Sequence, residues 1–166
     1  GTDQKDLGFK ILKLLVNENF KFTLVCSKKL TARPSTKSFI KKNIDKVKFL
    51  HLISKQKMMN EINKSHFCIC GPGIIKFDLS KLHKSFILIL RRNQINDIQI
   101  QNFIGLRNCK IIKINNIAND HIKTSILEYI KNDKLRHKHY LNTKKFFMNK
   151  IFLKKQTKLI KEIINL

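Results

Sequence analysis

The sequence predicts an α/β fold, a Rossmann-like three-layer α/β/α domain with a parallel sheet and a long C-terminal helical segment. Short apolar runs alternate with segments whose apolar residues recur at helical spacing, so strands and helices should follow one another along the chain. The run at residues 85–90 is apolar almost throughout, which is typical of parallel strands covered by helices on both faces. Such alternation implies right-handed crossovers between strands that run in one direction.

The predicted strands are short apolar runs, and they lie at residues 22–26, 47–53, 66–70, 85–90 and 109–114. The predicted helices have apolar residues on one face, and they lie at residues 4–17, 35–44, 55–63, 75–82, 93–104 and 119–130. Thr2 or Asp3 is expected to cap the first helix, and Ser35 the second. From Leu135 onward, recurring phenylalanine and isoleucine residues predict one long terminal helix or two shorter ones.

The composition is that of a globular protein. Hydrophobic residues make up 42% of the chain, and no apolar run is long enough to span a membrane. The first residues have neither the basic nor the apolar region of a signal peptide, so a cytoplasmic location is expected. The cysteines lie in or beside apolar runs, which predicts reduced core thiols and no metal site: Cys26, Cys68, Cys70 and Cys109.

The chain is strongly basic, with a net charge of +24. Lysine greatly outnumbers arginine, and isoleucine and asparagine are abundant, so AT-rich codon usage accounts for part of this charge. A dedicated nucleic-acid binder usually concentrates its charge and uses arginine for bidentate contacts. Here the charge is spread along the chain and is denser only in residues 131–166, so no specific nucleic-acid function is predicted. The competing class is a non-catalytic basic module that binds nucleic acid or anionic surfaces.

A glycine-rich turn, Gly71-Pro72-Gly73, connects a predicted buried strand to a predicted helix. Glycines let the backbone approach a ligand closely, and free amides at the start of a helix attract phosphate. The turn lacks the Lys-Ser/Thr of a P-loop and the spacing of a dinucleotide fingerprint, and a purely structural turn is the alternative. Ligands of parallel sheets bind beyond the carboxyl ends of the strands, which makes this turn, residues 1–4 and residues 53–55 the candidate loops.

Polar residues follow the turn at useful positions. Asp78, five residues after Gly73, is placed either to accept hydrogen bonds from ribose hydroxyls or simply to favour the dipole of its helix. Asn93 and Gln94 follow the apolar run at residues 85–90. Their amides either contact a sugar or phosphate or cap the next helix.

The order of these features resembles the C-terminal domain of GT-B-type nucleotide-sugar proteins. The resemblance is carried by Gly1-Thr2-Asp3, by the segment from Cys70 to Leu79, by the run at residues 85–90 and by Asn93-Gln94. In this order the chain is most similar to the UDP-sugar hydrolases of pseudaminic acid and spore-coat polysaccharide biosynthesis, the SpsG type. The resemblance implies a nucleotide-sugar-binding domain over residues 1–130. Residues 131–166 would be a basic helical segment that packs on this domain or on an N-terminal domain.

The resemblance also implies which residues contact UDP or a UDP-sugar. The residues that contact the diphosphate would be Gly1, Thr2, Asp3, Gly71, Pro72, Gly73 and Ile74. Asp78 would bind the ribose, and the uracil would lie on the backbone of Leu52, Ile53 and Ser54. Asn93 and Gln94 would face the donor sugar.

The chain departs from the family at several of these places. Ile74 and Ile75 stand where relatives often carry hydroxyl groups, and Asp78 stands in place of a glutamate. Residues 82–85 replace a Leu-Gly-x-Pro step. In proteins of the family that this chain resembles, the water-activating histidine lies in an N-terminal domain. None of the six histidines here matches it. This fragment alone is therefore expected to be inactive, with no catalytic residue, cofactor or metal of its own.

The expected function is UDP-sugar binding within a polysaccharide-biosynthesis enzyme, a UDP-sugar hydrolase whose catalytic N-terminal domain is absent from this chain. The alternative among enzymes is a GT-B glycosyltransferase, which passes the sugar to an acceptor instead of water. The terminal segment is expected to pack against protein, and peripheral contact with an anionic membrane is its alternative.

Overall fold

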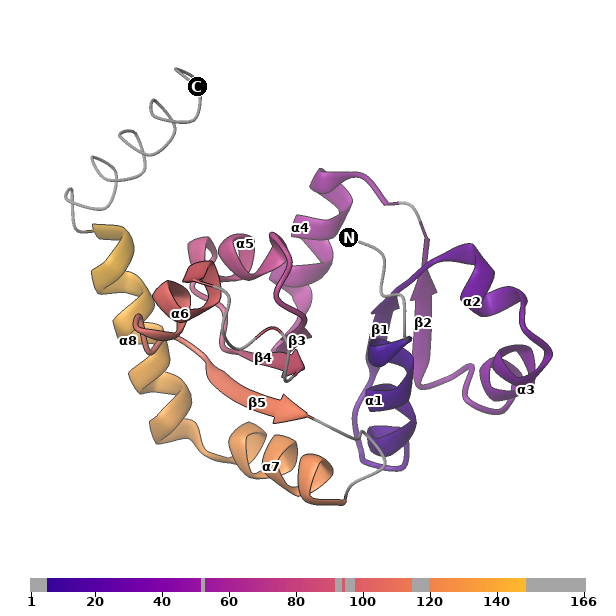
Figure 1. The fold of residues 1–166 in the computed structure, drawn as a ribbon. Helices are drawn as coiled ribbons and strands as arrows, with labels where there is room; N and C mark the ends of the chain where they lie inside the picture. Colours follow the sequence, from indigo (N-terminus) through magenta and orange to yellow (C-terminus); the bar gives the residue numbers. More distant parts are fainter. Residues whose placement is uncertain (1–5, 52, 92–93, 95–97, 115–119, 149–166) are drawn as a thin grey trace.

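The computed structural model describes residues 6–51, 53–91, 94, 98–114 and 120–148 and shows a mixed α/β fold with parallel strands (Figure 1). Strand β1 (Phe22–Val25) pairs in parallel with β2 (Val47–Leu50). Strand β4 (Phe86–Arg91) lies between β3 (Cys68–Cys70) and β5 (Lys110–Ile114), again with both pairings parallel. The prediction of an α/β fold with parallel strands is confirmed. The described strands form two sheets in place of one, a two-stranded sheet of β1 and β2 and a three-stranded sheet in the order β3-β4-β5.

Helices separate the strands along most of the chain. They are α1 (Leu7–Leu15), α2 (Lys28–Ala32), α3 (Pro34–Lys42), α4 (Lys55–Lys64), α5 (Ile75–Lys81), α6 (Ile98–Ile104), α7 (Asp120–Lys131) and α8 (Asp133–Met148). None of the helices within the described ranges is long and apolar enough to cross a membrane.

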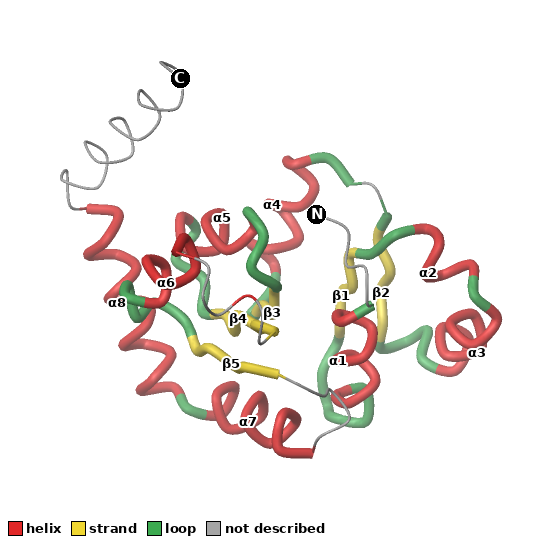
Figure 2. The backbone as a smooth tube through the Cα atoms, viewed as in Figure 1, coloured by secondary structure: helices red, strands yellow, loops and turns green. Residues whose placement is uncertain are grey.

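The core is built around β4, and every residue from Phe86 to Leu90 is buried, as the apolar run predicted. Side chains alternate between the two faces of a strand, so Ile87 and Ile89 pack with residues of α1 and α7. Phe86, Leu88 and Leu90 pack in a second cluster with residues of α4, α5 and α6. Figure 2 shows these two groups of helices on opposite sides of the three-stranded sheet.

Helix α1 packs against both sheets. Leu7, Ile11 and Leu15 belong to the cluster that includes β4 and β5. Phe9, Leu12 and Val16 pack with Leu30 of α2 and Val47 of β2. Because both faces of α1 are buried, the two sheets share one continuous interior, although no strand pairing between described residues joins them.

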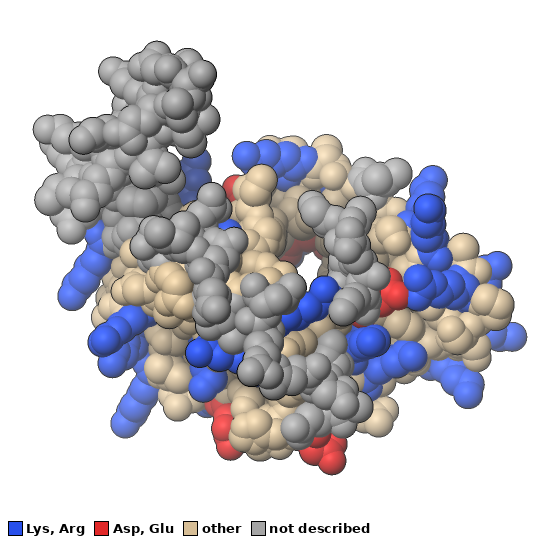
Figure 3. All heavy atoms as spheres, in the orientation of Figure 1, with Lys and Arg blue, Asp and Glu red and all other residues tan. Residues whose placement is uncertain are grey.

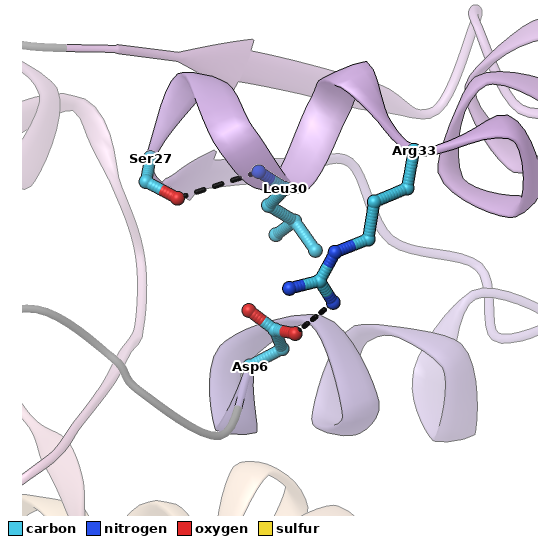
Figure 4. Close-up of polar contacts among 4 residues, drawn as sticks. All are labelled: Asp6, Ser27, Leu30 and Arg33. Carbon is cyan, nitrogen blue, oxygen red and sulfur yellow. Dashed lines mark hydrogen bonds and ion pairs between the residues drawn. The ribbon is translucent and has the colours of Figure 1, made fainter.

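The prediction for the segment between β1 and β2 was wrong about where its first helix begins. The segment after β1 was predicted to have no helix before Ser35, but it contains α2, whose N-cap is Ser27. Ser27 Oγ accepts a hydrogen bond from Leu30 N at 3.4 Å (Figure 4). Helix α3 begins one residue before Ser35, at Pro34, because proline suits the first turn of a helix.

Within the described residues, the first helix is shorter than the predicted range of residues 4–17. Helix α1 begins at Leu7, and Asp6 takes the N-cap position with a left-handed φ of 51°. The Asp6 carboxylate caps no amide but forms an ion pair with Arg33, at the junction of α2 and α3 (Figure 4). Thr2 and Asp3, the predicted caps, lie outside the described residues.

Helix α8, the described part of the C-terminal segment, packs on the rest of the domain. Tyr129 Oη of α7 lies 2.7 Å from His139 Nδ1 of α8. Asn142 Nδ2 donates to the carbonyl of Arg107 at 2.7 Å, and the Tyr140 ring contacts His83. The predicted domain boundary at residue 130 falls within α7, and the predicted helical segment beyond residue 148 lies outside the described residues.

Candidate functional site

The glycine turn and the end of β4 lie at the same edge of the three-stranded sheet. Cys70, the last residue of β3, pairs in parallel with Leu88 of β4, so the carboxyl ends of the two strands are neighbours. The turn follows β3 directly, and Gln94 follows β4. Ile53 and Ser54 follow β2, which belongs to the two-stranded sheet. Ligands of parallel sheets bind at edges of this kind.

The fold itself does not require glycine at the turn. Neither Gly71 nor Gly73 has a positive φ, the conformation for which glycine is usually needed. A Cβ atom added at either position would meet nothing within 4 Å. Ile74, the next residue, is 79% exposed. The space over both glycines is therefore open to a ligand, and an added side chain there would obstruct a ligand but no part of the fold.

Lys76 holds the carbonyl groups of this turn, a contact that the sequence did not predict. Its Nζ donates to Pro72 O at 2.7 Å and to Gly73 O at 3.3 Å, and the residue is only 3% exposed. The available signal was a lysine three residues after Gly73, on the first turn of the predicted helix.

The same contacts fix the direction of two amides. The peptide bonds here are trans, so the C=O and N–H of each peptide point in opposite directions. Because the carbonyls of Pro72 and Gly73 point towards Lys76, the N–H groups of Gly73 and Ile74 point away from it. Neither amide donates to another group in the part of the chain that the structure describes. The turn therefore presents two outward amides, an arrangement that suits an anion.

Asp78 is half-buried on α5, and its carboxylate has no hydrogen bond or ion pair with any described residue. Gln94 has a local partner, since its Oε1 accepts from Arg91 N at 3.0 Å. Ser54 Oγ accepts from Lys57 N at 3.2 Å and so caps α4. The glycine turn and Gln94 thus follow two neighbouring strands, and Asp78 lies on α5, the helix after the turn. The other predicted contact residues lie outside the described residues: Gly1, Thr2, Asp3, Leu52 and Asn93.

A second polar cluster lies at the carboxyl ends of β1 and β2. His51 Nδ1 is 3.1 Å from Cys26 O and 3.7 Å from Cys26 Sγ, and His51 Nε2 is 3.3 Å from Thr31 Oγ1. Burial, and secondarily the negative charge of Asp6, raises the pKa of the Cys26 thiol. The thiol therefore stays protonated at neutral pH, and this cysteine–histidine contact does not create an activated nucleophile. No sequence pattern predicted this cluster, although Cys26 and His51 each directly follow a strand.

The remaining cysteines behave as core thiols, as predicted. Cys68 and Cys70 both pack against the cluster that contains Cys109, which places them on one face of β3. Burial raises the pKa of Cys70 well above its usual range and that of Cys109 to about 12. Among the described residues, no group of three or more His, Cys, Asp or Glu side chains is arranged to hold a metal ion.

Comparison with known proteins gives no family assignment. No protein-family model matches the chain, and a search of the curated proteins also gives no match. The fold and the strand-end site define it as an α/β protein with parallel strands and a glycine turn at a sheet edge.

Proposed function

We propose that this chain is a nucleotide-binding domain that takes UDP or a UDP-sugar, with the diphosphate on the Gly71-Pro72-Gly73-Ile74 turn. The observation that carries the proposal is the pair of outward amides, at Gly73 and Ile74, beneath open space over two glycines. Backbone amides hold phosphate without any particular side chain. For this reason the absence of a hydroxyl group at Ile74 is compatible with the proposal.

Asp78 is the proposed ribose contact. A carboxylate accepts hydrogen bonds from neighbouring hydroxyl groups, and this one has both lone-pair sets uncommitted among the described residues. It lies on the first turn of α5, the helix that follows the glycine turn. The uracil is proposed to lie on the backbone of Ile53 and Ser54, and the sugar near Gln94.

The wider proposal is a Rossmann-like domain of a GT-B-type enzyme. It is supported by helices on both faces of β4 and by the sequence resemblance given above. Within that class we propose a UDP-sugar hydrolase, with a glycosyltransferase as the second candidate. The catalytic groups of either enzyme would come from a further domain, and this chain would supply the nucleotide site.

The proposal is tested by calorimetric titration with a ligand series: UDP, uridine and inorganic pyrophosphate. UDP should bind, and Asp78→Ala should weaken UDP binding by about 1–2 kcal/mol through the loss of a ribose contact. Pyrophosphate has no ribose, so its affinity should be the same for Asp78→Ala and the unchanged chain.

The ligand series separates a ribose contact from a general effect of charge. An Asp78→Ala variant that binds pyrophosphate more tightly and UDP equally would contradict the assignment of Asp78. Absence of UDP binding at millimolar concentration would contradict the nucleotide proposal as a whole. Binding that depends steeply on salt and is shared by unrelated polyanions would favour the basic module instead.

A further inference from the structure

We infer that Lys76 is a positioning residue for the anion site: it holds the glycine turn so that the Gly73 and Ile74 amides face the ligand, and it does not touch the ligand itself. This inference rests on the proposed function, because it takes the turn as the diphosphate site.

The Lys76 ammonium is enclosed by protein beneath the turn. Besides its contacts with the carbonyls of Pro72 and Gly73, Nζ lies 4.3 Å from the centroid of the Phe77 ring and 5.7 Å from that of Phe103. The two rings pack edge to face, with centroids 5.5 Å apart. Carbonyl oxygens and aromatic faces replace water around the buried charge, and they keep the ammonium on the inner side of the turn.

The backbone of Lys76 is fixed by a buried network. Ser80 Oγ donates to the carbonyl of Lys76 at 2.8 Å, and Asn108 Nδ2 donates to Ser80 Oγ at 3.0 Å. Ser80 and Asn108 are each 1% exposed. A buried chain of hydrogen bonds therefore runs from Asn108, two residues before β5, to the Lys76 backbone in α5.

The ammonium also strengthens the outward amides. A cation bound to a carbonyl polarises that peptide and makes its N–H a better hydrogen-bond donor. Both peptides of interest, Pro72–Gly73 and Gly73–Ile74, have the ammonium on the carbonyl side. Lys76 therefore orients the two amides and increases their attraction for an anion, although the anion approaches from the opposite side.

Lys84 offers a matched control elsewhere in the fold. Its Nζ donates to the carbonyls of Asn63 and Ser65, at 2.9 and 3.0 Å, at the end of α4. Lys76→Met and Lys84→Met each remove one ammonium and two carbonyl contacts, but only the first removes them from the turn.

The inference is tested by calorimetric titration of the full chain with inorganic pyrophosphate at constant ionic strength, together with the thermal midpoint of each variant. Lys76→Met should bind pyrophosphate about tenfold or more weakly than the unchanged chain. Lys84→Met should bind within about twofold of it. If Lys76→Met binds as the unchanged chain does, the inference is wrong and the proposed function stands. If the unchanged chain binds neither pyrophosphate nor UDP, both are wrong.

A measurement on the unchanged chain covers the case in which Lys76→Met does not fold. In an NMR titration with pyrophosphate, the amide resonances of Gly73 and Ile74 should shift most, while the Lys76 side-chain resonance should shift less. The largest change at Lys76 Nζ would mean direct contact with the anion and would overturn the positioning role. Unmoved Gly73 and Ile74 amides at saturation would overturn it as well.

Discussion

At the scale of single residues, His139 is the buried titratable group with the clearest consequence for stability. It is 8% exposed, and its Nδ1 lies 2.7 Å from Tyr129 Oη. Burial, and then the positive charges of Lys138 and Lys110, lowers the pKa of His139 from its ordinary value of 6.5. The neutral imidazole is therefore the form that the contact between α7 and α8 accommodates.

This predicts that the chain loses stability as the pH falls below neutrality. An unfolded His139 takes up a proton near pH 6.5, whereas the folded one does so only at a lower pH, so protons favour the unfolded state between the two values. Urea denaturation at several pH values should show a free energy of unfolding that decreases from pH 7.5 towards pH 5. His139→Gln should reduce this slope.

His137, two residues away and exposed, provides the control for that slope. His137→Gln should keep the pH dependence of the unchanged chain. Equal slopes for the chain and for His139→Gln would contradict the assignment of the dependence to His139.

Single residues of the site were predictable in part. The Gly71-Pro72-Gly73 turn was identified because glycines between an apolar run and a helical pattern are visible in sequence. The role of Lys76 was not, since its contact depends on a side chain that folds back on the turn beneath the aromatic rings of α5 and α6. No spacing rule specifies the direction of a lysine side chain.

At the scale of elements, β4 is the strand on which both halves of the three-stranded core depend. Leu88 is fully buried and packs in the cluster with α4, α5 and α6. Leu88→Ala should lower the free energy of unfolding by about 2–5 kcal/mol, because it leaves a cavity in close-packed surroundings. Urea denaturation measures this loss.

Leu141 of α8 is the matched control, since it is the same residue type with 41% exposure. Leu141→Ala should cost no more than about 0.5–1 kcal/mol. A similar cost for both substitutions would mean that β4 is not the centre of the core.

Elements with strong apolar patterns were the predictable ones. Strand β4 and helices α4, α5 and α7 lie within two residues of their predicted positions, because burial against neighbours determined their patterns. Helix α2 was missed because it is five residues long and buries only Leu30. Strand β2 ends three residues earlier than predicted, since the apolar run to Ile53 continues past the pairing with β1. Pairing, unlike apolar character, is not visible in one strand alone.

At the scale of the whole molecule, positive charge is distributed widely. The 35 Lys and Arg residues exceed the 11 Asp and Glu residues by 24, and several of the acids already pair with a base, as Glu18 does with Lys123 and Glu61 with Lys48. Figure 3 shows basic side chains spread over the visible face. Such a surface attracts polyanions without selecting among them, so ligand titrations need enough salt to screen it.

The division of the strands into two sheets was the largest difference between the predicted and the observed fold. The alternation of strands and helices specifies parallel crossovers, but the contact between the two sheets is made by both faces of α1. The periodicity of α1 predicted one apolar face on a shared sheet. Its second buried face, which includes Phe9 and Leu12, was not part of that prediction.

The most direct test of the central claim is a calorimetric titration with UDP of the unchanged chain and of Gly73→Ala. The fold has space for the added methyl group and no positive φ at this position, so the substitution should leave the stability unchanged or raise it by about 0.4–1 kcal/mol. The same methyl group would occupy the space where the diphosphate approaches the amides. The account predicts UDP binding by the unchanged chain and a loss of about tenfold or more in Gly73→Ala with undiminished stability. Equal UDP affinity in the two proteins would contradict it.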